Sequence, residues 1–228
     1  MECKGGIMKI DILTLFPNMF DGVFTESIIK RACELGKVEI NLINFRDFTK
    51  DPHNKVDDTP YGGGAGMVLM AQPIFDCVKS LKTDDSKVIL LTPSGIKYKQ
   101  EIAYDLKNEK HLIIICGHYE GFDERIKSIC DLELSIGDYV LTGGEIPAMV
   151  LVDSITRLLD GVITSESHIN DSFNNNLLDY PSYTKPRVYE GMEVPEVLLS
   201  GNHKKIDEYR HQEQIRITKE NRPDLLDE

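Results

Sequence analysis

The chain has 228 residues, of which 41% are hydrophobic and 28% are charged, and its formal net charge is −12. This is the composition of an ordinary soluble globular protein, with room for one large domain or for one domain and a smaller one. There is no run of about 18 apolar residues, which argues against a membrane span, and the acidic balance argues against a protein that holds nucleic acid by bulk electrostatics.

The N-terminal sequence MECKGGIMKI lacks the long apolar core and the cleavage site of a signal peptide. We interpret the residues before Met8 as a short extension. The cysteines are scattered, and no two of them have C-x-x-C spacing; they are Cys3, Cys33, Cys77, Cys116 and Cys130. Such usage is typical of a reducing compartment in which cysteines serve as small hydrophobic residues, so we expect a cytoplasmic protein.

Strand and helix patterns alternate through the first two thirds of the chain. Residues 9–15 form an apolar run that predicts a strand, and a helical period from Met19 to Leu35 is closed by Gly36. The alternation of apolar and polar residues over 38–45 is typical of a half-covered strand. Short apolar runs at 87–91, 111–116 and 132–136 are each followed by a loop and a helix-compatible segment, after Lys97, Asp123 and Glu145. This order predicts the α/β class, with a mainly parallel sheet and helices on both faces.

The composition changes at Gly161. Residues 161–176 are polar, rich in Ser and Asn and without a period, which predicts a flexible linker. Beyond it, prolines delay regular structure, and residues 195–226 have the pattern of two or three short helices. We therefore predict an α/β domain over 1–160, a linker over 161–176 and a small helical domain over 177–228.

Three of the predicted strands end in loops rich in Gly and Pro, at residues 92–95, 117–121 and 136–147. Open parallel sheets bind ligands at the carboxyl ends of their strands, so a shared pocket is expected there. The loops contain no lysine beside their glycines, and the glycines of 62–67 match neither phosphate-binding pattern. A ligand recognised by backbone N–H and C=O groups, such as an adenosine, fits these loops better than a triphosphate does. The negative charge of Glu120 would favour a cationic ligand.

Other kinds of chemistry have little support in the sequence. The six histidines are isolated from one another, so we expect no metal site, and the adjacent acids Asp57 and Asp58 fit a turn better than a magnesium ion. No G-x-S-x-G nucleophile elbow is present. Acid–base chemistry remains, and the candidates for it are Asp171, in the polar linker, and Arg157, in the helix that opens with Glu145. Taken alone, either residue also fits a structural role, as a turn former or a surface ion pair.

Two segments together make the chain identifiable: CGHYEGFDERI at 116–126 and SIGDYVLTGGEIPAMVLVDSITRLL at 135–159. With LFPNMF, FRDFTKDPHNKVDDTPYGGGAGM, LLDYPSYTKP and GMEVPEVLLSGNH, they span nearly the whole chain in family order. The chain resembles the bacterial tRNA (guanine-N1)-methyltransferase family, TrmD, of the SPOUT superfamily of knotted methyltransferases. The resemblance implies methyl transfer from S-adenosylmethionine to N1 of guanosine 37, beside the anticodon, in tRNAs that carry guanosine at position 36.

The resemblance also implies a fold feature and a set of binding residues. In this family the three strand-end loops are threaded as a deep trefoil knot, an exception to the rule that protein chains are not knotted. The implied cofactor contacts are Leu91, Thr92, Pro93, Gly117, Tyr119, Glu120, Ile136, Gly137, Tyr139, Leu141, Gly143, Gly144 and Pro147. The implied substrate contacts are Asp57, Asp58, Gly62, Gly63, Gly64, Ser172 and Asp179, with 55–67 receiving the flipped-out guanine.

By the same resemblance, Asp171 is the general base that removes the N1 proton, and Arg157 donates to O6 as negative charge develops there. The family forms homodimers in which the cofactor knot of one subunit faces the linker and C-terminal domain of the other, so that Asp171 acts across the interface. Members depend on magnesium, and Glu120 is a candidate for the neighbourhood of that ion. Family members often continue with another helix beyond the position of Glu228, and a basic face from Lys185, Arg187, Lys204, Lys205 and Arg210 is needed to grip tRNA.

Three alternatives stay open from the sequence. A knotted ribose 2′-O-methyltransferase would need no base for a ring nitrogen. A non-catalytic RNA-binding protein would keep the knot as a scaffold only. A phosphate-binding hydrolase is disfavoured by the missing lysine-bearing glycine loop.

Overall fold

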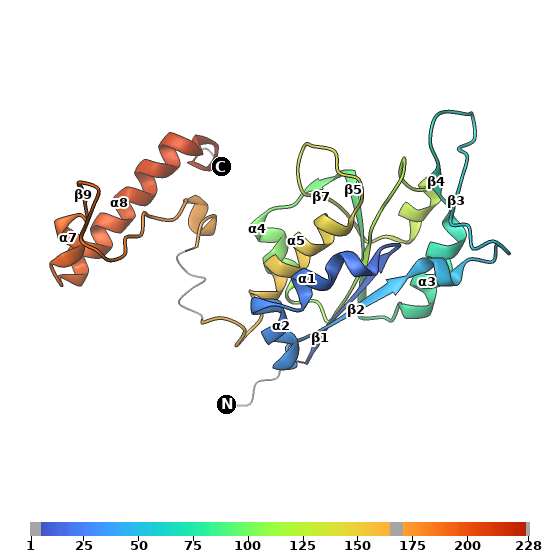
Figure 1. The fold of residues 1–228 in the computed structure, drawn as a ribbon, viewed down its shortest axis with the longest axis horizontal. Helices are drawn as coiled ribbons and strands as arrows, with labels where there is room; N and C mark the ends of the chain where they lie inside the picture. Colours follow the sequence, from blue (N-terminus) through green and yellow to red (C-terminus); the bar gives the residue numbers. More distant parts are fainter. Residues whose placement is uncertain (1–5, 165–170, 227–228) are drawn as a thin grey trace. The chain divides into compact units, whose positions relative to one another are not determined.

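The computed structural model describes residues 6–164 and 171–226. They divide into two compact units, with the boundary between Ile163 and Thr164, and each unit is described by itself (Figure 1). The predicted linker residues 165–170 and the N-terminal extension up to residue 5 lie outside the described residues.

A five-stranded sheet forms the centre of the N-terminal unit, in the order β2–β1–β6–β5–β7. All of its neighbouring strands pair in parallel, which confirms the predicted α/β class. The strands are β1 (Met8–Thr14), β2 (Val38–Asn44), β5 (Ser86–Lys97), β6 (His111–Ile115) and β7 (Leu132–Ser135).

Helices cover both faces of this sheet, as predicted (Figure 1). Because side chains alternate along a strand, Ile10 and Ile12 of β1 enter one core, while Leu13 enters the other. The first core is covered by α1 (Asp21–Phe24), α2 (Ser27–Glu34), α4 (Gln100–Leu106) and α5 (Glu145–Thr156). The second is covered by α3 (Ala71–Leu81) and by the 3-10 helices Phe45–Phe48 and Glu124–Ile129.

The single helix predicted from Met19 to Leu35 is wrong, because the structure breaks it. A 3-10 helix, Pro17–Phe20, leads into α1, and α2 begins only at Ser27. The hydroxyl and the amide of Thr25 both donate to the carbonyl of Asp21, which closes α1. Glu26 is then extended, with φ −130° and ψ 162°, so the chain leaves the helical path before α2.

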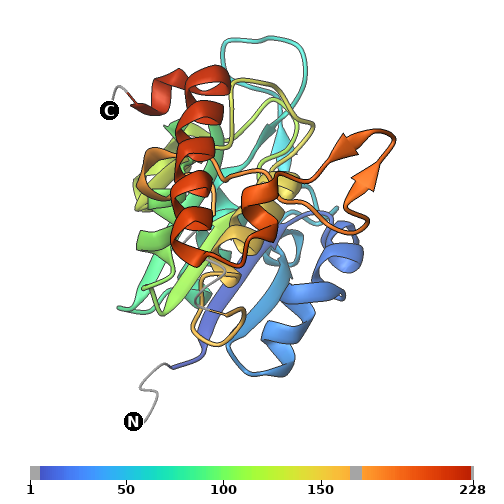
Figure 2. The same cartoon turned by 90° about the vertical axis from the view of Figure 1, so that its left-hand side faces the viewer.

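The C-terminal unit contains a hairpin and one long helix (Figure 2). Strands β8 (Val188–Tyr189) and β9 (Met192–Glu193) pair antiparallel, and α7 (Glu196–Leu199) precedes α8 (His203–Asn221), which is followed by the 3-10 helix Pro223–Leu226. The predicted number of helices, two or three, is confirmed, but α8 has 19 residues and is not short. Residues 203–221 contain no Gly or Pro, and the side chain of Asn202 caps α8 by accepting from the amide of Lys205 at 3.2 Å.

Two cysteines of the described chain, Cys77 and Cys116, are buried, and Cys130 is half-buried. These three serve as small hydrophobic residues, as expected. Cys33 is exposed, so that interpretation does not extend to it. No helix in the described part of the chain is both long enough and apolar enough to span a membrane.

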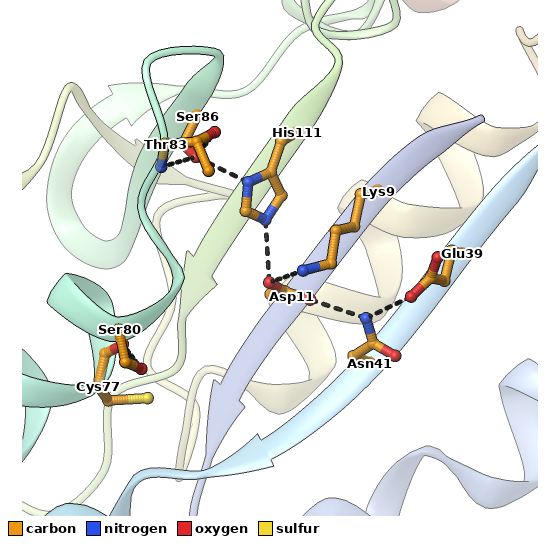
Figure 3. Close-up of polar contacts among 9 residues, drawn as sticks. All are labelled: Lys9, Asp11, Glu39, Asn41, Cys77, Ser80, Thr83, Ser86 and His111. Carbon is orange, nitrogen blue, oxygen red and sulfur yellow. Dashed lines mark hydrogen bonds and ion pairs between the residues drawn. The ribbon is translucent and has the colours of Figure 1, made fainter. Parts of the chain in front are cut away.

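A buried polar network joins four strands near their amino ends (Figure 3). Asp11 of β1 is fully buried and contacts Lys9 Nζ, Asn41 Nδ2 and His111 Nε2, each at 2.9 Å. The Nδ1 of His111 lies 2.7 Å from the hydroxyl of Ser86. Burial raises the pKa of Asp11, but hydrogen bonds from Lys9, Asn41 and His111 outweigh it, and the pKa stays below its ordinary value.

Candidate active site

A pocket of about 280 Å³ lies at the carboxyl ends of β5, β6 and β7. The three Gly-rich segments at these strand ends line it, as the sequence predicts for an open parallel sheet. All thirteen residues that the resemblance assigns to the cofactor are among its lining residues. The others are His118, Gly121, Phe122, Leu134, Ser135, Val140 and Thr142.

Glycine is required where backbones meet beneath the pocket. A Cβ on Gly144 would lie 2.7 Å from both the Cα of Cys116 and the amide nitrogen of Gly117. The amide of Gly144 donates to the carbonyl of Gly117 at 2.8 Å, and His118 forms a β-bridge with Gly143. The start of α5 therefore packs backbone to backbone against the end of β6, which only glycine allows.

The end of β5 folds over β7 in the same close manner. Strand β5 pairs with Leu134 twice, through Leu91 and through Ile96, so residues 92–95 bulge out toward the pocket. A Cβ on Gly95 would lie 2.5 Å from the amide nitrogen of Leu134. The bulge places Thr92 and Pro93 in the pocket wall.

Aromatic rings form one side of the pocket. The ring of Phe16 lies 4.7 Å from that of His118, and the ring of His118 lies 5.3 Å from that of Tyr119. Tyr119 has a φ of +60°, and Gly121 closes the turn by donating to the carbonyl of His118 at 3.2 Å. This left-handed turn presents Tyr119, 45% exposed, to the pocket mouth.

The pocket has little charge. Among the described residues that line it there is no Lys or Arg, and Glu120, which is exposed, is the only carboxylate. Glu145 lies behind the wall and is only 2% exposed. Burial, together with the charge of Glu145, holds the pKa of Cys116 well above its ordinary value, so that thiol stays protonated.

The predicted substrate segment is tied to the pocket by backbone hydrogen bonds. Strands β3 (Asp57–Asp58) and β4 (Val68–Leu69) form an antiparallel hairpin around the Gly-rich loop. The amide of Glu120 donates to the carbonyl of Met67 at 3.0 Å, and the amide of Leu69 donates to the carbonyl of Gly121 at 2.9 Å. A Cβ on Gly66 would meet the Glu120 side chain at 2.3 Å. Gly62, Gly63 and Gly64 have positive φ angles, and a Cβ on Gly62 or Gly63 would meet nothing within 4 Å.

The predicted catalytic residues do not line the pocket. Arg157 caps the C-terminal end of α5, about 15 Å along the helix from Pro147 at 1.5 Å per residue. Asp171 belongs to the other unit, where it is half-buried. Near it, Ser172 and Asp179 are brought together, because the amide of Asp179 donates to the hydroxyl of Ser172 at 3.0 Å.

A metal centre is not supported. Within residues 6–164 and 171–226, no group of three or more His, Cys, Asp or Glu side chains could hold a metal ion. Glu120 supplies the one carboxylate among the described lining residues, so a Mg²⁺ ion there would take its other oxygen ligands from water or from a bound molecule.

Two site residues were missed by the sequence reasoning. His118 lies in the Gly-rich segment 117–121, and its position between Gly117 and Tyr119 could have indicated a pocket residue. Glu145 follows a Gly-Gly pair at a helix start, where an acidic residue reads as an ordinary helix-dipole partner. Its burial depends on packing against Thr14, 131 residues away in the chain, so the sequence alone could not reveal it.

Comparison with known proteins identifies relatives that match nearly the whole chain, including the segments that line the pocket. The family model described as tRNA (Guanine-1)-methyltransferase TrmD matches residues 8–228. A protein of Malacoplasma penetrans (strain HF-2) named tRNA (guanine-N(1)-)-methyltransferase is 60% identical over 219 residues, which are 96% of this chain and 97% of the relative. Proteins of the same name from Bacillus cereus (strain AH820) and Bacillus anthracis (strain A0248) are each 56% identical over 226 residues, covering 97% of this chain and 93% of theirs.

Proposed function

This chain belongs to the tRNA (guanine-1)-methyltransferase TrmD family, and from that premise we propose that it transfers a methyl group from S-adenosylmethionine to N1 of guanosine 37 in tRNAs with guanosine at position 36. The observation that carries the proposal is the pocket at the ends of β5, β6 and β7, lined by all thirteen expected cofactor residues. The reaction would take place in the cytoplasm, where tRNA is used.

The pocket fits an adenosine-bearing sulfonium compound. Its wall is largely glycine backbone and apolar side chains, which suits an adenine read by amide and carbonyl groups. The described lining residues offer no cationic clamp for phosphates, and the one carboxylate among them, that of Glu120, suits a positively charged ligand. The residues named for the cofactor in the sequence would hold it, and S-adenosylmethionine would supply an electrophilic methyl group on its sulfonium. Magnesium finds no matching set of ligands among the described residues, so no step is assigned to it.

The mechanism needs a proton acceptor, because N1 of guanine carries a proton and its lone pair is not free to attack. Asp171 would accept that proton as the bond between N1 and the methyl carbon forms. The guanidinium of Arg157 would donate to O6, where negative charge builds as the proton leaves. A positioned base is typically worth about 10²–10⁴ in rate, and a donor aimed at developing charge about 3–4 kcal/mol.

A second copy of the chain would complete the site. Residues Ile146, Val150, Asp153 and Arg157 recur on α5 at spacings of three and four, so they share one helix face. The Ile146 and Val150 side chains on that face are 47% and 40% exposed. Covering them with a second subunit would bury apolar surface and carry Arg157, with Asp171 on its linker, toward the pocket of the partner. We propose that the trefoil knot is formed by the ends of β5 and β6 and by the 136–144 loop, the segments that line the pocket.

The test is radiolabelled methyl transfer to a tRNA carrying G36 and G37, compared with the same tRNA carrying another base at position 37. Methylation of the first and none of the second supports the proposal. A tRNA that stays methylated after G37 is replaced would indicate a ribose 2′-O-methyltransferase instead.

A further inference from the structure

Glu145 is a buried carboxylate directly behind the pocket wall. It is the first residue of α5, and its Oε1 accepts a hydrogen bond of 2.8 Å from the hydroxyl of Thr14 at the end of β1. Its Oε2 is buried and accepts no hydrogen bond from the residues that the structure describes. A buried carboxylate oxygen without a donor is unfavourable, so a cationic group bound beside it would be stabilised by it.

The side of the pocket lies next to this oxygen. A Cβ on Gly143 would lie 2.3 Å from Glu145 Oε2 and 3.1 Å from His118 Nε2, and both Gly143 and His118 line the pocket. The Oε2 of Glu145 therefore lies beside two parts of the pocket lining, the backbone of Gly143 and the imidazole of His118. The first turn of α5 supplies a partial positive charge to Glu145 but no full cation.

We propose that Glu145 is the residue by which the pocket prefers a cationic sulfonium over a neutral thioether. The inference rests on the proposed function, since it concerns the donor and the by-product of that reaction. On transfer, the bond between sulfur and the methyl carbon breaks, sulfur keeps the electron pair, and the carbon bonds to N1. The ligand thereby loses its positive sulfur charge, and the attraction to Glu145 is lost with it.

Burial separates the role of Glu145 from that of Glu120. Glu120 is exposed, so solvent and salt screen its charge. Glu145 is 2% exposed and acts through a medium that screens far less. The attraction to Glu145 is greatest before the methyl group moves, so Glu145 determines specificity and release of the by-product and is not a catalytic residue.

The experiment measures dissociation constants of S-adenosylmethionine and S-adenosylhomocysteine by calorimetry, for the full chain and for Glu145→Gln. The quantity compared is the ratio of the two constants, by-product over donor. We expect this ratio to fall by about tenfold in Glu145→Gln, because the glutamine keeps the shape and removes the charge. Thr14→Val is the matched control, because it removes the hydrogen bond to Oε1 and leaves the charge, so its ratio should stay that of the wild type.

Several outcomes would overturn the inference. If Glu145→Gln weakens the binding of both compounds equally, or if Thr14→Val lowers the ratio as much as Glu145→Gln does, Glu145 acts only through packing. If Glu145→Gln does not fold, the inference is tested by how the ratio of the two dissociation constants depends on salt in the wild-type protein. A constant ratio between low and high salt fits a buried charge, and a ratio that collapses assigns the preference to exposed groups. Wild-type protein that binds neither compound contradicts the proposed function itself.

Discussion

The described residues that line the pocket include one carboxylate, that of Glu120, and one imidazole, that of His118. Glu120 packs against Gly66. Glu145 is buried behind the wall and bonded to Thr14. Under the proposed function the base for N1 is Asp171 of the other unit, because a half-buried carboxylate is suited to that task.

Replacing Asp171 with alanine should separate binding from chemistry. We expect Asp171→Ala to bind S-adenosylmethionine nearly as the wild type does, because the cofactor pocket belongs to the other unit. Single-turnover methyl transfer should fall by about 10²–10⁴, the usual contribution of a positioned base. Asp207→Ala, at an exposed site on α8, is the control and should keep the wild-type rate. Turnover by Asp171→Ala at the rate of the wild type would remove Asp171 from the role of base.

The buried Asp11 network makes a separate prediction about stability. Because the pKa of Asp11 is lowered in the folded protein, its stabilising effect is complete above the unfolded pKa of about 4 and is lost as pH falls through the folded value. Asp11→Asn should lower the free energy of unfolding at pH 7 by about 1.5–3 kcal/mol, the range for hydrogen bonds to a charged group. Denaturant unfolding between pH 7 and pH 2 measures it. The gap between the two proteins should close at the acidic end, and a gap independent of pH would contradict this assignment.

At the level of helices and strands, the sequence predicts what is local and misses what depends on distant contacts. The five strands of the sheet follow apolar runs, and their ends carry the Gly-rich segments that line the pocket. The break at Thr25 and the β8–β9 hairpin were also encoded locally. Glu190 and Gly191 have φ angles of +50° and +80°, the two positive values of a tight hairpin turn. By contrast, the contact of Gly144 with Cys116 joins segments 28 positions apart and has no local signal.

That contact predicts a large effect for a small substitution. Gly144→Ala would place a Cβ 2.7 Å from the backbone of Cys116 and Gly117, so α5 and β6 would have to separate. We expect a loss of about 1–3 kcal/mol of stability, as for other overpacked sites, together with weaker S-adenosylmethionine binding by calorimetry. Gly22→Ala in α1 is the control, since nothing lies within 4 Å of its added Cβ. If both alanine variants bind and unfold alike, the close approach of α5 and β6 is not what shapes the pocket.

The C-terminal unit should contribute charge to tRNA binding even though the whole chain is acidic. Lys204 and Lys205 are exposed in the first turn of α8, while Arg210 lies over the ring of Tyr180, 4.7 Å from its centroid. With about five phosphate contacts, the logarithm of the binding constant should fall with the logarithm of salt concentration at a slope of about −3 to −4. Replacing Lys204 and Lys205 with alanine should reduce that slope by about 1–2. Lys30→Ala, exposed on α2, should leave it unchanged, and a flat response in the wild type would count against this surface.

For the whole molecule, we propose that the reaction uses two copies of the chain. The pocket lies at the start of α5 and Arg157 at its end, and a helix cannot bend back on itself to join them. The exposed Ile146 and Val150 lie on the same helix face as Arg157, so the surface that would bury apolar area in a dimer is also the surface that would deliver the guanidinium. In a symmetric dimer each subunit then supplies a pocket to its partner and receives Arg157 and Asp171 from it.

Subunit mixing tests this arrangement without a structure of the dimer. Tyr119→Ala damages the pocket, and Asp171→Ala removes the base; each variant alone should be nearly inactive. When equal amounts are dissociated together and reassociated, half of the dimers are mixed, and each mixed dimer has one site with both defects and one with neither. If the site is shared between subunits, methyl transfer should recover to about a quarter of the wild-type rate. If each subunit carries a complete site, every site in the mixture holds one defect, and the activity stays at that of the separate variants. The same mixture prepared without dissociation is the control, because its dimers are all of one kind and no shared site can be intact.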